Sequence, residues 1–324
     1  MGTLDTIKQP IKQEMSTFND RFRAHLSSNV PLVDRVMRYM VKRKGKQLRP
    51  ILVFLSAKIQ GSITDATYIG ASLVEIMHTA TLVHDDVVDD ADQRRGFFSI
   101  NALWKNKIAV LIGDYLLSKV LLIAVETKEY NLLEYVSGAV KSMSEGELLQ
   151  IEKARKLDIT EEVYFEIIQQ KTASLLETCC VVGAASAGGS DEEIEKFRML
   201  GRHLGLAFQI KDDLFDFERV NLTGKPVGID IKEQKMTLPL IKALQEADSK
   251  QRQHIIKTIK KHHDRPKKVQ EVVDFVRQSG GLEYARSKML EHINQAKEIL
   301  YNFPQTEERD ALALVLDYTA QRKK

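Results

Sequence analysis

The feature that most constrains this chain is a cluster of four aspartates within six residues. The cluster closes the stretch from Thr79 to Asp90. The residues before it, Ile69 to Val83, are mostly apolar, with Gly70 as their only glycine and no proline. This composition predicts a helix that carries at its end the carboxylates Asp85, Asp86 and Asp89.

These carboxylates indicate a metal site. Asp85 and Asp89 are four residues apart and therefore share a helix face, where like charges repel and the helix dipole is unfavourable. A hard divalent cation offsets this repulsion, and Mg²⁺ suits the pattern because it binds one or two carboxylates and completes its shell with water and phosphate. The alternative is a solvated acidic surface, against which the neighbouring apolar residues argue: Leu82, Val83, Val87 and Val88.

The second half of the chain repeats this pattern. Apolar residues between Gly205 and Phe217 lead into three further aspartates, Asp212, Asp213 and Asp216. Asp212 and Asp216 are again four apart on one predicted helix face. The two clusters belong to different helices, and we expect them to face each other across a helical bundle. Several Mg²⁺ ions between them could hold a polyphosphate.

Composition and length predict a single all-α domain. The chain has 324 residues but no Pro/Gly/Ser-rich linker, so we interpret residues 1–324 as one domain. Only 17 Gly and 7 Pro interrupt segments with apolar residues at helical spacing. The net charge of +3 gives no general attraction for nucleic acid or an acidic membrane. Cys179 and Cys180 are adjacent in an apolar run and are typical of core residues in a reducing cytosol.

No segment is expected to insert stably into a membrane. Met1 to Pro10 lacks the apolar core of a signal peptide. The most apolar stretch, Ile108 to Val125, contains Asp114 and Lys119 and is interrupted by Gly113. We therefore expect a soluble, cytoplasmic protein that touches membranes only transiently, to release an apolar product.

The paired Asp-Asp-x-x-Asp motifs resemble those of the trans-isoprenyl diphosphate synthases, the head-to-tail prenyltransferases, in particular their octaprenyl- and heptaprenyl-type long-chain members. The match spans roughly positions 42 to 240 by motif. It implies the isoprenoid synthase fold, a bundle of roughly ten or more helices around a central substrate cavity, in a homodimer. It also implies Mg²⁺, on the order of three ions per active site, and two substrates, isopentenyl diphosphate and an allylic diphosphate.

Several basic residues inherit roles from this resemblance. The family loop Gly-Lys-Arg-x-Arg-Pro, which holds isopentenyl diphosphate, reads here Gly45-Lys46-Gln47-Leu48-Arg49-Pro50. Lys46 and Arg49 inherit that role, and Gln47 is a departure that removes one positive charge. His78 and Arg95 are likewise implied for isopentenyl diphosphate, and Arg94 for the allylic diphosphate. Read without the family, the loop is an ordinary solvated turn and His78 a core or surface residue.

The resemblance also implies the residues beside the reacting carbon. Lys171 and Thr172 are implied to lie beside the allylic diphosphate, where a helix kink and the Thr hydroxyl orient dipoles toward a carbocation, and Gln209 is placed to do the same. Without the family resemblance, Lys171 and Thr172 would be interpreted as ordinary helical residues. Lys225 and Lys235 are implied to contact the allylic diphosphate from a lid-like loop.

The implied reaction is Mg²⁺-assisted ionisation of an allylic diphosphate, attack by isopentenyl diphosphate and loss of a proton. Ala80 and Thr81 are small where short-chain relatives carry bulky aromatics, which favours a medium- or long-chain product over farnesyl or geranylgeranyl diphosphate. A di-iron protein would need a second Glu-x-x-His besides Glu75 and His78, and the sequence has none. A catalytically silent subunit typically lacks one acidic motif, and a terpene cyclase needs no isopentenyl diphosphate loop.

Overall fold

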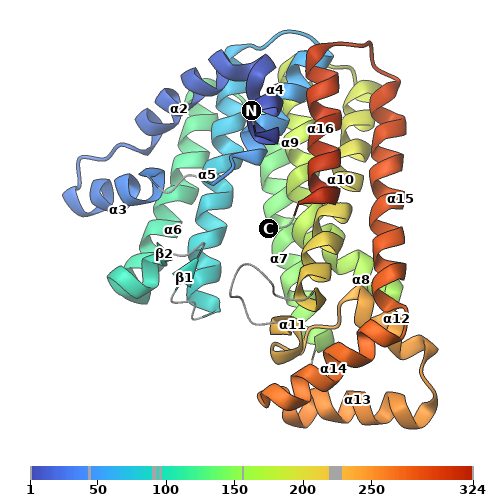
Figure 1. Cartoon of the computed structure of the whole chain (residues 1–324). Coiled ribbons are helices and arrows are strands. Elements are labelled where there is room, and N and C mark those ends of the chain that lie inside the picture. The colour runs from blue at the N-terminus through green and yellow to red at the C-terminus, as the bar shows by residue number, and fades with distance from the viewer. Residues whose placement is uncertain are drawn as a thin grey trace. The chain divides into compact units, whose positions relative to one another are not determined.

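The computed structural model describes residues 2–42, 45–89, 93–94, 97–154, 157–218 and 228–322. Nearly all of these residues are helical, and more than ten helices are present among them, which confirms the all-α expectation (Figure 1). The chain forms two compact units. One consists of Met1–Val140, Thr178–Arg198 and Phe303–Leu314, and the other of Lys141–Glu177, Met199–Asn302 and Val315–Lys324. A single domain over residues 1–324 stays a prediction.

The first unit contains the amino-terminal elements. They are α1 (Thr3–Lys8), the 3₁₀ turn η1 (Gln9–Ile11), α2 (Lys12–Leu26), α3 (Pro31–Lys42), α4 (Leu48–Gln60), α5 (Asp65–Val88), β1 (Gln93–Arg94), β2 (Phe97–Phe98) and α6 (Ile100–Thr127). The two strands pair antiparallel, with Gln93 opposite Phe98 and Arg94 opposite Phe97. The amphipathic pattern of residues 4–26 predicts one continuous helix. The structure interrupts it near Pro10, because proline lacks the amide hydrogen that a continuing helix needs.

Helices α5 and α6 lie side by side in this unit (Figure 1). Gly113 permits this approach, because a Cβ there would collide with the imidazole of His84. The same imidazole lies 3.6 Å from a carboxylate oxygen of Asp114, measured from Nε2. Gly70 likewise allows α5 to pack against Val182. The helix that carries the first acidic motif is therefore held on two sides.

The second unit contains the remaining elements. It holds α8 (Glu161–Ile168), the π-helix η2 (Gln169–Ala173), α11 (Ile229–Lys232), α12 (Leu238–Glu246), α13 (Ser249–His262), α14 (Pro266–Gln278) and α15 (Gly281–Tyr301). Four helices contribute residues to both units: α7 (Tyr130–Ala154), α9 (Ser174–Ser186), α10 (Asp191–Phe217) and α16 (Glu307–Gln321).

The carboxyl end of α10 is anchored by α14. Arg277 donates from Nε and Nη2 to the backbone oxygen of Phe217, at 2.9 and 2.6 Å. A cation at this position satisfies a terminal carbonyl and complements the negative end of the helix dipole. The three residues of the second acidic motif therefore lie on a helix whose end is fixed.

Two histidines join α10 to α15. The Nδ1 atoms of His203 and His292 are 3.1 Å apart, and the rings are stacked with centroids 5.3 Å apart. Burial, followed by the neighbouring His292, lowers the pKa of His203 to about 4, and burial also lowers the pKa of His292. One ring must donate while the other accepts, so the contact requires at least one neutral imidazole.

This pair predicts a loss of stability in mild acid. The unfolded chain binds protons at these histidines below about pH 6.5, whereas folded His203 resists protonation until its pKa near 4. The contribution is therefore fully present above pH 6.5 and is lost as the pH falls from 6.5 toward 4. We expect the melting temperature to fall less over this range in His203→Gln than in the parent protein. The exposed His254→Gln variant is the control. A His203→Gln variant whose melting temperature falls with pH as steeply as that of the parent protein would contradict the assignment.

Candidate active site

The first acidic motif lies at the carboxyl end of α5, as predicted. The helix ends at Val88, and the amide of Asp89 donates to the backbone oxygen of Asp85 at 2.8 Å. Asp85 and Asp89 are exposed, whereas Asp86 is only 4% exposed. The side chain of Asn101 donates to the backbone oxygen of Asp86 at 3.0 Å, which ties the motif to α6. Two exposed carboxylates thus stand at the negative end of a helix dipole.

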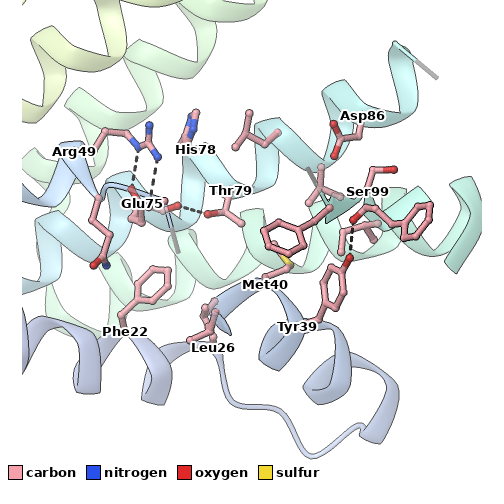
Figure 2. Close-up of a pocket in the computed structure, with 18 residues that line it drawn as sticks. Phe22, Leu26, Tyr39, Met40, Arg49, Glu75, His78, Thr79, Asp86 and Ser99 are labelled. Carbon is pink, nitrogen blue, oxygen red and sulfur yellow. Dashed lines mark hydrogen bonds and ion pairs between the residues drawn. The ribbon is translucent and has the colours of Figure 1, made fainter. Parts of the chain in front are cut away.

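A buried ion pair joins α4 to α5, upstream of the motif (Figure 2). Arg49 Nε is 2.9 Å from Glu75 Oε2, and its Nη2 is 3.4 Å from Glu75 Oε1. Both side chains are largely buried, and Thr79 Oγ1 donates to the backbone oxygen of Glu75 at 2.6 Å. The paired carboxylate fixes the plane of the guanidinium, which retains further N–H donors for another anion.

This ion pair lines a cavity of about 160 Å³. Its polar wall includes Arg49, Glu75, His78 and Asp86, and its apolar wall includes Phe22, Leu26, Met40, Phe97 and Phe98 (Figure 2). A cavity with charged groups on one wall and aromatic and aliphatic groups on the other suits a small ligand with an anionic and an apolar part.

The loop before α4 borders the cavity. Gly45 and Gln47 line it, and Lys46 is exposed between them. Gln47 adopts a left-handed conformation with φ 56°, and its side-chain Nε2 donates to Asn19 Oδ1 at 3.0 Å. The structure thus places Lys46, Arg49 and His78 in one region of the first unit, as their sequence motifs suggested.

In the second unit a π-helix presents Lys171 and Thr172. The turn Gln169–Ala173 forms the π-helix η2 between α8 and α9, which agrees with the predicted local distortion. Such bulges alter the direction of neighbouring side chains and are frequent at functional sites. The ammonium of Lys171 forms an ion pair with Glu147 and donates to Gln150 Oε1 at 3.1 Å.

A chain of four hydrogen-bonded side chains runs through this unit. Thr172 Oγ1 donates to Gln209 Oε1 at 2.7 Å, and Gln209 Nε2 donates to Asp213 Oδ1 at 2.8 Å. The hydroxyl of Tyr164 donates to Asp213 Oδ2 at 2.6 Å. The chain therefore links two predicted catalytic residues to the second acidic motif.

The three carboxylates of this motif have different partners. Asp212 Oδ1 forms an ion pair with Arg322 Nη2 at 2.8 Å. Asp213 is buried and belongs to the hydrogen-bonded chain. Asp216 accepts from the amides of Ile229 and Asp230 at 2.8 and 3.1 Å, at the start of α11.

Burial shapes the ionisation of this region. It raises the pKa of Asp213 to about 7, against the opposing hydrogen bonds from Tyr164 and Gln209. Burial, followed by the charges of Asp213 and Asp216, raises the pKa of Asp230 to about 8. Crowded carboxylates with raised pKa values fit a divalent cation, because its charge would offset both burial and repulsion.

Within the described residues, no group of three or more His, Cys, Asp or Glu side chains is arranged to hold a metal ion by itself. Magnesium does not require such a cage, since it retains water and binds substrate phosphate alongside one or two carboxylates. The donor chemistry of Asp85, Asp89 and Asp212 fits Mg²⁺ on these terms.

The remaining predicted residues are placed only in part. Arg94 lies in β1, whereas Arg95 and Lys225 lie outside the described residues. The ammonium of Lys235 forms an ion pair with Glu233. Gln234 adopts φ 57°, a conformation that favours glycine.

Sequence reasoning missed four participants in these contacts. Glu75 was considered only for its spacing from His78, not as the partner of Arg49, and Tyr164, Asp230 and Arg322 were not singled out. Tyr164 stands in an apolar helical run, and Arg322 stands in the carboxyl-terminal region, where no motif is readable. A signal exists only for Asp230, an acidic residue shortly after the second motif.

Comparison with known proteins decides the family. The family model described as polyprenyl synthetase matches residues 30–276. The chain belongs to this family. It is 36% identical to a short chain isoprenyl diphosphate synthase from Methanothermobacter thermautotrophicus, over 94% of this chain and 95% of that one. It is 35% identical to an octaprenyl diphosphate synthase from Escherichia coli, over 98% and 99%.

A solved polyprenyl synthase from Caulobacter crescentus CB15, complexed with calcium and isoprenyl diphosphate, superposes with a TM-score of 0.91. It is 31% identical and covers 99% of this chain and 98% of its own. The chain is accordingly an all-α prenyltransferase, as predicted. The calcium bound in that structure is a divalent cation, the class of metal predicted here.

The approach of α10 to the π-helix yields a stability prediction. A Cβ on Gly205 would collide with the backbone and side chain of Ala173, so we expect Gly205→Ala to lower the free energy of unfolding by about 1–3 kcal/mol. Gly138→Ala on α7 is the matched control, because nothing lies within 4 Å of a Cβ there. It should raise stability by roughly 0.5–1 kcal/mol through helix propensity. Denaturant unfolding measures both, and equal effects would refute the close packing.

Proposed function

We propose that this prenyltransferase condenses isopentenyl diphosphate head-to-tail onto an allylic diphosphate to make a medium- or long-chain trans-polyprenyl diphosphate. The observation that carries the proposal is the cavity beside Arg49. The cavity is lined by the Arg49 guanidinium, which is paired with Glu75, by His78, and by aromatic and aliphatic side chains. A diphosphate ester of a short branched hydrocarbon has matching charged and apolar ends.

The residues divide into two groups by role. Lys46, Arg49, His78 and Arg95 bind isopentenyl diphosphate, and Arg94, Lys171, Lys225 and Lys235 bind the allylic diphosphate. Thr172 and Gln209 direct oxygen dipoles toward the allylic carbocation and stabilise it without attacking it. Loss of a proton from the condensed product then restores a double bond.

We propose that the six motif aspartates supply the protein ligands for Mg²⁺, on the order of three ions: Asp85, Asp86, Asp89, Asp212, Asp213 and Asp216. Bound Mg²⁺ neutralises the departing diphosphate. The exposure of Asp85 and Asp89 supports direct ligation by these two. The burial of Asp86 and Asp213 supports a role in fixing the geometry of their neighbours.

The direct assay incubates the protein with Mg²⁺, isopentenyl diphosphate and, in turn, each short allylic starter, and sizes the products. We expect extension by repeated addition, lost when EDTA removes the metal. Ionisation of the starter without incorporation of isopentenyl diphosphate would favour a cyclase, and inactivity with every starter would favour a silent subunit.

The cavity predicts a selective binding defect. Because Lys46 and Arg49 serve one diphosphate, Lys46→Ala and Arg49→Ala should raise the KM for isopentenyl diphosphate by at least about tenfold, the effect of losing one charge-assisted hydrogen bond. The KM for the allylic substrate should change far less. Steady-state kinetics with each substrate varied separately measures both constants. Equal increases would show that the loop serves only the structure, and Lys42→Ala, an exposed change on α3, is the control.

Product length is proposed to depend on α5. The hydrocarbon grows away from Asp85 along the face that passes Thr81 and Ala80, where both side chains are small. Met77 and Leu73 follow one and two turns further back, about 5 and 11 Å along the axis, and both are buried. We propose products of roughly six to ten isoprene units, as in long-chain members of the family. A short-chain product is the alternative.

This account predicts the outcome of Ala80→Phe. A phenyl ring cannot be bypassed in a closely packed tunnel, so products should shorten to roughly three or four units while Mg²⁺ dependence persists. Chromatography of the dephosphorylated products measures the length. Thermal unfolding serves as the control for a general packing defect, because Ala80 is fully buried. Unchanged length in a folded variant, or a parent enzyme that stops at farnesyl diphosphate, would reject this account.

We further propose a cytoplasmic homodimer that meets membranes only to release product. This proposal is supported by α6. Among the described residues it is the one helix that is long and apolar enough to cross a membrane, and only 39% of its most apolar 18-residue stretch is buried. Its exposed apolar side chains are Leu103, Val110, Leu111, Leu121, Leu122 and Val125. A second copy of the chain would cover this surface.

The double variant Leu111→Glu/Leu122→Glu should be monomeric in sedimentation equilibrium, whereas the parent should be dimeric, because two buried charges cannot be accommodated in an apolar interface. Leu290→Glu, a change at an exposed leucine of α15, is the control. A monomeric parent would reject the proposal.

A further inference from the structure

The hydrogen-bonded chain of the second unit has a fixed direction. The amide nitrogen of Gln209 can only donate and lies 2.8 Å from Asp213 Oδ1, and the hydroxyl of Tyr164 donates to Asp213 Oδ2. The amide of Gln209 therefore presents its nitrogen to Asp213 and its oxygen to Thr172. The hydroxyl of Thr172 must then donate its one hydrogen to Gln209, at 2.7 Å.

This direction determines which end of the Thr172 dipole remains available. With its hydrogen committed to Gln209, the hydroxyl exposes only oxygen lone pairs to a bound molecule. Oxygen lone pairs stabilise a developing positive charge, whereas a freely rotating hydroxyl would present its hydrogen for part of the time. A fixed dipole also costs no reorganisation when the charge forms.

The origin of the chain is Tyr164. Tyr164 is 3% exposed and Asp213 is 4% exposed, so bulk solvent has little access to replace a lost hydrogen bond. Without the tyrosine hydroxyl, Asp213 Oδ2 would lose the donor recorded for it in a buried setting, and the carboxylate could rotate toward other donors. Gln209 would then lose the contact that orients its amide.

We propose that Tyr164 is a positioning residue that acts through Asp213 and Gln209 to hold the Thr172 oxygen toward the allylic carbocation. This inference rests on the proposed prenyltransfer function and adds to it a residue that itself touches no substrate. It differs from a merely structural role in one respect: the effect of Tyr164 on turnover must pass through the hydroxyl of Thr172.

Tyr164→Phe removes the hydroxyl and keeps the ring. We expect kcat to fall at least tenfold, with both KM values within about twofold of the parent, because ground-state binding does not use the dipole. Tyr284→Phe is the matched control. Its hydroxyl donates to Glu161 at 2.7 Å in the same unit but outside the chain, and its kcat should be unchanged.

A double-mutant cycle with Thr172→Val decides between the two roles. Valine matches threonine in shape but has no hydroxyl to orient, so adding Tyr164→Phe to Thr172→Val should lower kcat by less than twofold further. Additive losses, or an unchanged kcat in Tyr164→Phe, would overturn the relay. Should Tyr164→Phe fail to fold, a double-mutant cycle of Gln209→Met with Thr172→Val tests the same coupling at the residue that contacts Thr172 directly. An inactive parent enzyme would instead reject the proposed function, which keeps the two failures apart.

Discussion

The placement of carboxylates where charge is disfavoured is the constraint on which this structure depends. Asp85 and Asp89 stand at the negative end of the α5 dipole, and Asp213 is buried on α10. In water alone such groups would weaken both helices. The protein supplies local polar partners for the buried positions, Asn101 at the backbone of Asp86 and Tyr164 with Gln209 at Asp213. The more exposed carboxylates, Asp85 and Asp89, are the ones proposed to bind a cation directly.

Backbone irregularities accompany several of the proposed functional residues. The π-helix η2 contains Lys171 and Thr172, and Gln47 takes a left-handed conformation between Lys46 and the start of α4. A regular helix would give side chains one repeating set of directions, whereas a bulge or a left-handed residue changes the direction locally. Such conformations cost free energy, and the contact of Gln47 with Asn19 helps to hold one of them. The side chains proposed to bind substrate thereby take their directions from the fold itself.

Much of the fold followed from local pattern. Apolar spacing predicted α5 and placed the first aspartates at its end, because helical periodicity and dipole arguments depend only on neighbouring residues. The interruption near Pro10 was missed because the amphipathic pattern continues across it.

The contacts between distant residues could not be predicted in the same way. Glu75 and Arg49 are oppositely charged residues among many, and only the fold brings them together. Tyr164 looks like an apolar helix residue until its hydroxyl is found on Asp213. The left-handed geometry of Gln47 and Gln234 was also invisible, since glutamine has no preference for positive φ. Such features depend on tertiary structure, to which a single sequence gives no direct access.

The central claim is that the acidic motifs bind metal together with a diphosphate. Electron paramagnetic resonance of Mn²⁺, a substitute for Mg²⁺, measures free hexa-aqua ion directly. Titrations with and without a non-ionisable allylic thiolodiphosphate compare the Mn²⁺ affinity of the free and the analogue-bound protein. The Asp85→Asn variant tests whether this carboxylate is a metal ligand. The account predicts weak Mn²⁺ binding alone, binding at least about tenfold tighter with the analogue, and loss of that gain in Asp85→Asn. Equal Mn²⁺ affinity with and without the analogue, or a full gain in Asp85→Asn, would contradict it.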